Sequence, residues 1–117
     1  MKLDCLAERT GARIVVASRK VTVSLEQVYA GDRVSDLLNA AGDHVLLVTN
    51  LASEHLVRVA ELMDIPAICL VGGQLPSEAM VRAAREHGTA LLVSPVGLFE
   101  TCGRIYVTLS DERRGPG

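Results

Sequence analysis

The sequence predicts an α/β fold, a three-layer α/β/α arrangement around a mainly parallel sheet of about four to five strands. Three short, almost continuously apolar segments are typical of strands buried on both faces, as in parallel sheets. Two amphipathic segments lie between them, as expected when helices connect parallel strands. The apolar segments are 44–49, 67–71 and 90–94, and the helical segments are 53–64 and 76–87.

Shorter signals predict the remaining elements. Residues 13–18 have the pattern of a strand, and 21–23 and 27–30 are further extended chain. Gly31-Asp32 then turns into a short helix over 34–41, which Gly42 ends. Near the other end of the chain, four residues form a helical stripe: Leu98, Cys102, Ile105 and Leu109.

The two helices between the strands begin alike. Ser53-Glu54 and Ser77-Glu78 lie 24 residues apart, and a Val-Arg pair and an alanine recur at the same offset. Two consecutive strand–helix units therefore share a design, and Ser53 is a candidate helix cap.

The length of 117 residues and the 49% hydrophobic content suit one aliphatic core. We expect a single domain over 1–117, with its core at about 21–109 and a flexible tail at 111–117.

Charge and composition argue against several partners. The net charge is −2 with no basic stripe, and Tyr29, Phe99 and Tyr106 are the only aromatic residues, so nucleic acid is not expected as a partner. No apolar stretch approaches the roughly 20 residues of a membrane span, so no membrane partner is expected either.

Cys5, Cys69 and Cys102 are an odd number of widely separated thiols. They indicate neither a disulfide framework nor a metal site. The first residues lack the apolar run of a signal peptide, so we expect a cytoplasmic protein with reduced thiols.

A ligand would be expected beyond the carboxyl ends of the strands, where loops and helix N-termini converge. An anionic or nucleotide-like small molecule suits such an edge, because Arg33 could clamp a phosphate. Plain turn chemistry is the alternative for each loop, as is an ion pair of Arg33 with Asp36. The candidate ligand-binding residues are Asp32, Arg33, Thr49, Asn50, Gly72, Gly73 and Ser94.

No catalytic set can be assembled from the sequence. The three histidines lie apart, and residues 97–104 lack both the spacing and the lysine of a phosphate loop. We therefore expect no enzymatic activity, no catalytic residues and no cofactor.

The order and spacing of several segments resemble the DRTGG domain family over about residues 21–109. These segments are 29–37 (Tyr-Ala-Gly-Asp-Arg-Val-Ser-Asp-Leu), 45–49, 65–68 (Ile-Pro-Ala-Ile), Gly72-Gly73, and Phe99-Glu100-Thr101 with Ile105. The Asp-Arg-Thr-Gly-Gly string itself is absent; Asp32-Arg33 and Gly72-Gly73 hold its residue types at separate positions. The chain thus looks like a stand-alone member, similar to the N-terminal domain of HPr kinase/phosphorylase and the middle domain of long phosphotransacetylases.

This resemblance implies a non-catalytic regulatory or ligand-sensing module that forms a homodimer and modulates a partner protein. Two alternatives are an accessory domain that completes a separately encoded kinase or acyltransferase, and a purely structural dimer. The stripe from Leu98 to Leu109 either covers the sheet, which we favour, or forms the dimer contact.

Overall fold

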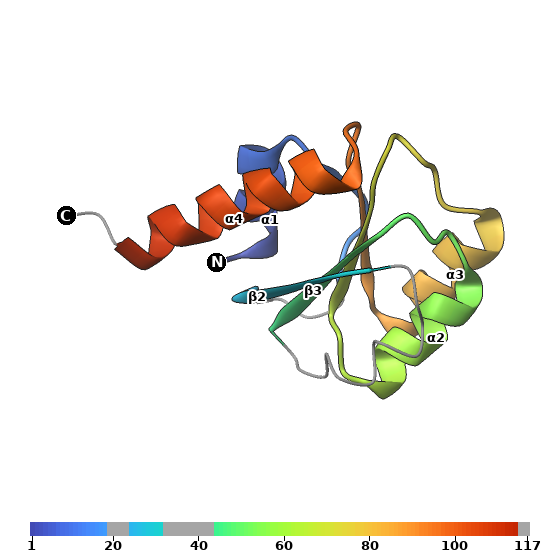
Figure 1. The fold of residues 1–117 in the computed structure, drawn as a ribbon. Helices are drawn as coiled ribbons and strands as arrows, with labels where there is room; N and C mark the ends of the chain where they lie inside the picture. Colours follow the sequence, from blue (N-terminus) through green and yellow to red (C-terminus); the bar gives the residue numbers. More distant parts are fainter. Residues whose placement is uncertain (19–23, 32–43, 115–117) are drawn as a thin grey trace.

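The structure is a computed structural model that describes residues 1–18, 24–31 and 44–114. Figure 1 shows the helices and strands of these segments. In chain order they are α1 (Leu3–Thr10), β1 (Arg13–Val16), β2 (Gln27–Ala30), β3 (Val45–Thr49), α2 (Glu54–Leu62), β4 (Ala67–Leu70), α3 (Glu78–His87), β5 (Ala90–Val93) and α4 (Leu98–Arg114).

The strands form a five-stranded sheet in the order β1-β5-β4-β3-β2. Strands β2, β3, β4 and β5 are parallel to one another, whereas β1 pairs with β5 in the antiparallel sense. The prediction of a mainly parallel sheet is therefore confirmed. The central strands β3, β4 and β5 are buried at every residue, which explains their continuous apolar sequences.

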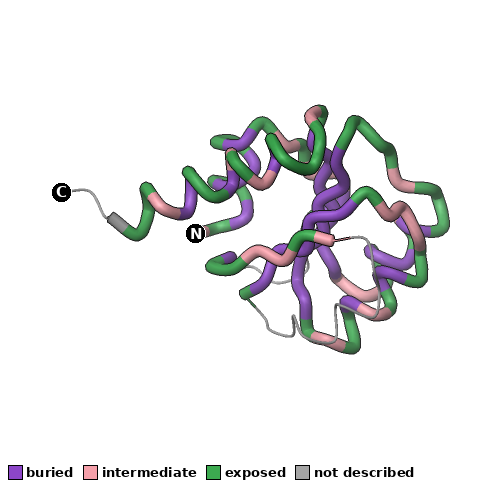
Figure 2. The backbone as a smooth tube through the Cα atoms, viewed as in Figure 1, coloured by how far each residue is buried: buried purple, intermediate pink, exposed green. Residues whose placement is uncertain are grey.

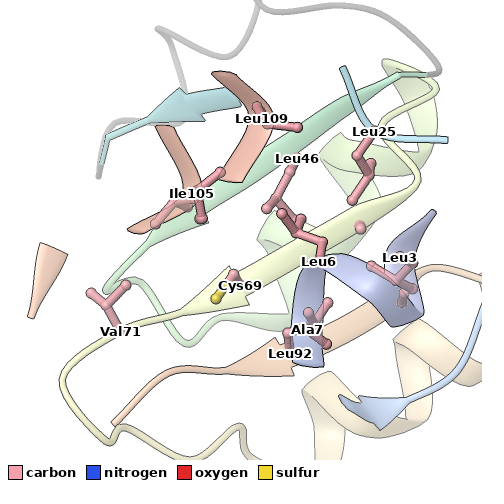
Figure 3. Close-up of a cluster of buried hydrophobic side chains, with 13 residues drawn as sticks. Leu3, Leu6, Ala7, Leu25, Leu46, Cys69, Val71, Leu92, Ile105 and Leu109 are labelled. Atoms are coloured by element: carbon pink, nitrogen blue, oxygen red, sulfur yellow. The ribbon is translucent and has the colours of Figure 1, made fainter. Parts of the chain in front are cut away.

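Helices cover both faces of the sheet, as the three-layer prediction requires. Helices α1 and α4 lie on one face, and α2 and α3 lie on the other (Figure 1). Successive residues of β3 therefore belong to different cores, since side chains along a strand alternate between the two faces of a sheet. Leu46 lies in the core under α1 and α4, and Leu47 lies in the core under α2 and α3. Figure 3 shows Leu46 with Leu6 and Ile105 in the first core, and Figure 2 shows the buried centre of the sheet.

Helices α2 and α3 begin with the serine caps that their repeated sequence indicates. The Ser53 hydroxyl accepts a hydrogen bond from the His55 N–H at 3.2 Å. The Ser77 hydroxyl accepts one from the Met80 N–H at 3.1 Å. Each cap thus satisfies one N–H group that the first helical turn leaves without a backbone partner.

Helix α1 was not among the elements predicted from the sequence. Its buried residues, Leu3, Leu6, Ala7 and Thr10, follow the spacing of one helical face. The helix packs against α4, and the Arg104 guanidinium of α4 donates to the Thr10 carbonyl at 3.1 Å.

The prediction of a flexible tail at 111–117 is wrong for residues 111–114, because α4 continues to Arg114. Three contacts hold this end of the helix. Asp111 lies 3.5 Å from Arg9, Glu112 lies 3.3 Å from the N-terminal amine, and Arg113 donates to the Glu26 carbonyl at 2.7 Å. Residues 115–117 lie outside the described residues.

The boundary of the first strand differs less from its prediction than the end of α4 does. The first strand ends at Val16, two residues before its predicted end. The extended chain predicted at 21–23 and the short helix predicted at 34–41 lie outside the described segments.

The helical stripe on α4 divides between core and surface. Ile105 and Leu109 are buried in the core, whereas Leu98 is 41% exposed. The core role is therefore confirmed for Ile105 and Leu109. Across the described segments, we find no helix with the length and apolar character needed to cross a membrane.

Candidate ligand site at the carboxyl ends of the strands

The carboxyl ends of the parallel strands come together at one edge of the sheet. Thr49 pairs with Leu70, and Leu70 pairs with Val93, so β3, β4 and β5 end level with one another. Five predicted site residues lie at these ends or shortly after them: Thr49, Asn50, Gly72, Gly73 and Ser94. Asp32 and Arg33 lie outside the described residues, but the preceding Gly31 N–H donates to the Val48 carbonyl at 3.0 Å.

Backbone hydrogen bonds join the loops that follow β4 and β5. The Gly72 N–H donates to the Val96 carbonyl at 2.7 Å, and the Gly73 N–H donates to the Ser94 carbonyl at 2.9 Å. Both glycines have left-handed φ values, +72° and +71°, which residues with a side chain rarely adopt. The Gly72-Gly73 pair is thus explained by the turn, and its N–H groups are already engaged within the protein.

The Ser94 hydroxyl is also an internal group. It lies 2.8 Å from the Thr101 hydroxyl, which in turn donates to the Val96 carbonyl at 3.2 Å. Because the single Thr101 proton is used in that bond, Ser94 donates to Thr101. Ser94 is 2% exposed, so its hydroxyl fixes the loop after β5 against the start of α4.

Thr49 and Asn50 differ in exposure. The buried Thr49 hydroxyl accepts a hydrogen bond from the Leu51 N–H at 3.1 Å, which shapes the turn after β3. Asn50 is exposed, as are Gly72 and Gly73. Among the described candidates, Asn50 therefore has the side chain that a ligand can reach, whereas the exposed Gly72-Gly73 backbone has its N–H groups engaged.

The helix N-termini at this edge carry negative charge. Glu54, Glu78 and Glu100 occupy the first turns of α2, α3 and α4. Carboxylates there already complement the positive ends of the helix dipoles. An anionic ligand at this edge therefore depends on a cation, and among the candidate residues only Arg33 supplies one.

Neither Cys69 nor Cys102 belongs to this edge, because Cys69 is buried in the core and the partly buried Cys102 packs against that core. Burial, with a smaller contribution from the nearby Cys102, raises the pKa of the Cys69 thiol to about 12. Burial also raises the pKa of Cys102. Both thiols are therefore protonated at neutral pH, which makes them poor nucleophiles. Within the described segments, no cluster of three His, Cys, Asp or Glu side chains has a metal-binding arrangement.

The sequence did not predict that Thr101 would form a hydrogen bond with Ser94 at this edge. Its role depends on the contact with Ser94, seven residues earlier, and no local pattern marks a threonine in the first turn of a helix for that purpose.

No family model matches the chain, and no curated protein matches it. Among solved structures it is similar to the regulatory region of Clostridium perfringens pyrophosphatase, which comprises CBS and DRTGG domains and was determined with its activator, diadenosine tetraphosphate. The TM-score is 0.73 at 12% sequence identity, and the match covers 89% of this chain and 45% of that one. The chain thus spans less than half of that regulatory region. Together with the sequence resemblance, this likeness shows that the chain has a DRTGG-like domain fold.

Proposed function

We propose that this protein is a non-catalytic regulatory module that binds an anionic, nucleotide-like small molecule. In this proposal it acts in the cytoplasm as a homodimer and changes the state of a partner protein. One observation carries the proposal: the fold is shared with a regulatory region whose structure holds a nucleotide activator.

The proposed ligand lies across the carboxyl ends of β2, β3 and β4. Arg33 follows β2 in the sequence and supplies the positive charge, while the exposed amide of Asn50 donates to and accepts from the ligand. Gly72 and Gly73 keep the neighbouring surface free of side chains, so that a ligand can approach the backbone. The buried hydroxyls of Thr49 and Ser94 hold the loops after β3 and β5 in place through hydrogen bonds within the protein.

The chemistry of this edge supports a binding role rather than catalysis. The Ser94 and Thr101 hydroxyls are bonded to each other and to a backbone carbonyl, with no base among those partners. Activation of a hydroxyl nucleophile requires an adjacent base. The raised pKa values of Cys69 and Cys102 likewise disfavour a reactive thiolate.

Titration calorimetry of the purified protein tests the proposal directly. The panel is diadenosine tetraphosphate, ATP, ADP, AMP and acetyl phosphate, and each mixture is afterwards analysed for reaction products. We expect saturable binding of at least one nucleotide and no turnover. Absence of binding across the panel would contradict the ligand-sensing role, and turnover abolished by one substitution in this chain would contradict the non-catalytic role.

A further inference from the structure

A groove of about 1020 Å³ runs between α4 and the edge strand β2. On the strand side it is lined by Val28 and Ala30, and on the helix side by Phe99, Cys102 and Tyr106. Arg113 lies at one end, where its guanidinium donates to the Glu26 carbonyl at 2.7 Å. The groove is therefore mainly apolar, with a fixed cation at its end.

Large apolar side chains gather on the exposed part of α4. Phe99 is 92% exposed, Tyr106 is 73% exposed and Leu98 is 41% exposed, and all three line the groove. Single exposed apolar residues are ordinary, but a contiguous group beside an apolar groove marks an interaction surface. Phe99 and Tyr106 are two of the three aromatic residues in the chain, and neither is used in its core.

The residues that face the groove follow a seven-residue repeat. Phe99, Tyr106 and Arg113 are spaced by seven, and Cys102 and Leu109 each follow one of them by three. This is the spacing with which one helix packs along another in a coiled coil. The occupant that the groove fits is therefore a helix.

The ends of the repeat are complementary to each other. Tyr106 lies midway, with the Phe99 ring seven residues before it and the Arg113 guanidinium seven residues after it. In an antiparallel pair of identical helices related by a two-fold axis at Tyr106, each Phe99 ring meets Arg113 of the second copy. An arginine on an aromatic ring is a favourable contact, and antiparallel helices also oppose their dipoles.

The surface of α4 leaves room for a second helix to approach closely. A Cβ atom added at Gly103 would meet nothing within 4 Å, and Ser110, one repeat later, is also small. Burial of Phe99 and Tyr106 alone would remove roughly 300 Å² per copy from water. The other residues of the groove bring this toward the about 600 Å² per partner of a small specific interface.

We propose that the α4–β2 groove binds α4 of a second copy of this chain, in antiparallel orientation, with the two-fold axis at Tyr106. The inference rests on the homodimer of the proposed function and specifies its interface. It assigns the contact to Phe99, Cys102, Tyr106 and Arg113, whereas Ile105 and Leu109 serve mainly the core of their own subunit.

Sedimentation velocity at tens of micromolar tests this interface with two matched variants. Tyr106→Glu places a charge on the axis, while Val107→Glu adds the same charge to the next, also exposed residue, which does not line the groove. We expect a dimer for the parent and for Val107→Glu, and a monomer for Tyr106→Glu. A dimer that persists in folded Tyr106→Glu would overturn the interface but not the homodimer, and a monomeric parent would overturn both.

Cysteine cross-linking keeps the test decisive if Tyr106→Glu does not fold. In a Cys5→Ser background, Tyr106→Cys on the axis should form a disulfide-linked dimer with a mild oxidant, because a disulfide needs Cα atoms about 4.4–6.8 Å apart. Val107→Cys is the control and should link far less. Equal linking of the two, or linking of neither, would contradict the proposed axis. Ligand binding is measured separately by calorimetry, so its failure would not be confused with failure of the interface.

Discussion

The Ser94 hydroxyl, at the end of β5, lies 2.8 Å from the Thr101 hydroxyl in the first turns of α4. Both residues are buried, and Thr101 also donates to the Val96 carbonyl between them. This pair joins the candidate ligand edge to the helix that borders the α4–β2 groove. These two hydroxyl groups therefore connect the start of α4 to the edge of the sheet.

Replacement of Thr101 by valine should destabilise the protein. The change keeps the shape of the side chain but leaves the buried Ser94 hydroxyl without its acceptor, which costs about 1–3 kcal/mol. Urea unfolding followed by circular dichroism measures this loss. Thr101→Ser is the control and should retain most of the stability. Equal stability of the valine variant and the parent would show that the hydroxyl pair contributes nothing.

Replacement of Gly73 by alanine should also destabilise the protein. Its φ of +71° lies in the left-handed region, where a side chain costs about 1–2 kcal/mol. Gly97 is the matched control, because its φ lies outside that region and an added Cβ would meet nothing within 4 Å. Thermal unfolding should separate the two alanine variants. If they unfold together, backbone strain at Gly73 is not the reason for the glycine.

The two serine caps should contribute independently to stability. Ser53→Ala and Ser77→Ala each remove one capping bond, which is worth about 1 kcal/mol. The double variant should lose the sum, because the caps share no partner. Ser→Asp at each position retains an acceptor and serves as the control. Unfolding free energies from urea titration decide the matter, and an unchanged alanine variant would exclude that cap as a stabilising bond.

Stability should fall at high pH because of Cys69. Burial raises the pKa of this thiol from its ordinary value of 9.0 to about 12 in the folded protein. Between these two values the unfolded chain loses the proton and the folded protein keeps it, so stability is complete below pH 9 and decreases above it. Urea midpoints from neutral pH to about pH 10.5 measure the slope. Cys69→Ala should have a shallower slope, and identical slopes would contradict this origin.

The continuous apolar strands made most of the fold predictable. A segment such as Val45–Thr49 is buried at every residue, so its sequence and its place in a parallel sheet agree closely. The repeated serine starts likewise located α2 and α3. Helix α1 was missed although Leu3, Leu6, Ala7 and Thr10 carry a helical pattern, because its eight residues are short and its burial depends on α4.

The end of α4 was mispredicted for a related reason. Residues 111–113 are polar and exposed, so their composition is typical of a tail. Ion pairs of Asp111 with Arg9 and of Glu112 with the N-terminal amine hold them in the helix. Such partners lie about a hundred positions away along the chain, and a local pattern cannot identify them.

The candidate site was predictable in position but not in its internal bonding. Parallel topology places Thr49, Gly72 and Ser94 at one edge, as expected. The sequence did not indicate that the Gly72 and Gly73 N–H groups bind the carbonyls of the next loop. That bonding leaves Asn50 as the exposed polar side chain among the described candidates and makes Arg33 the decisive residue of the proposal.

Titration calorimetry of the parent, Arg33→Ala and Arg82→Ala tests the central claim most directly, with the tightest-binding nucleotide of the panel as the probe. Arg82 is an exposed arginine of α3 outside the proposed edge, so its variant removes the same charge. Arg33→Ala loses a charge-assisted hydrogen bond worth about 1.5–3 kcal/mol, so this variant should bind the nucleotide about 10- to 150-fold more weakly than the parent. Arg82→Ala should bind it like the parent. Equal affinities in all three proteins would show that no ligand is held by Arg33 at the carboxyl ends of the strands.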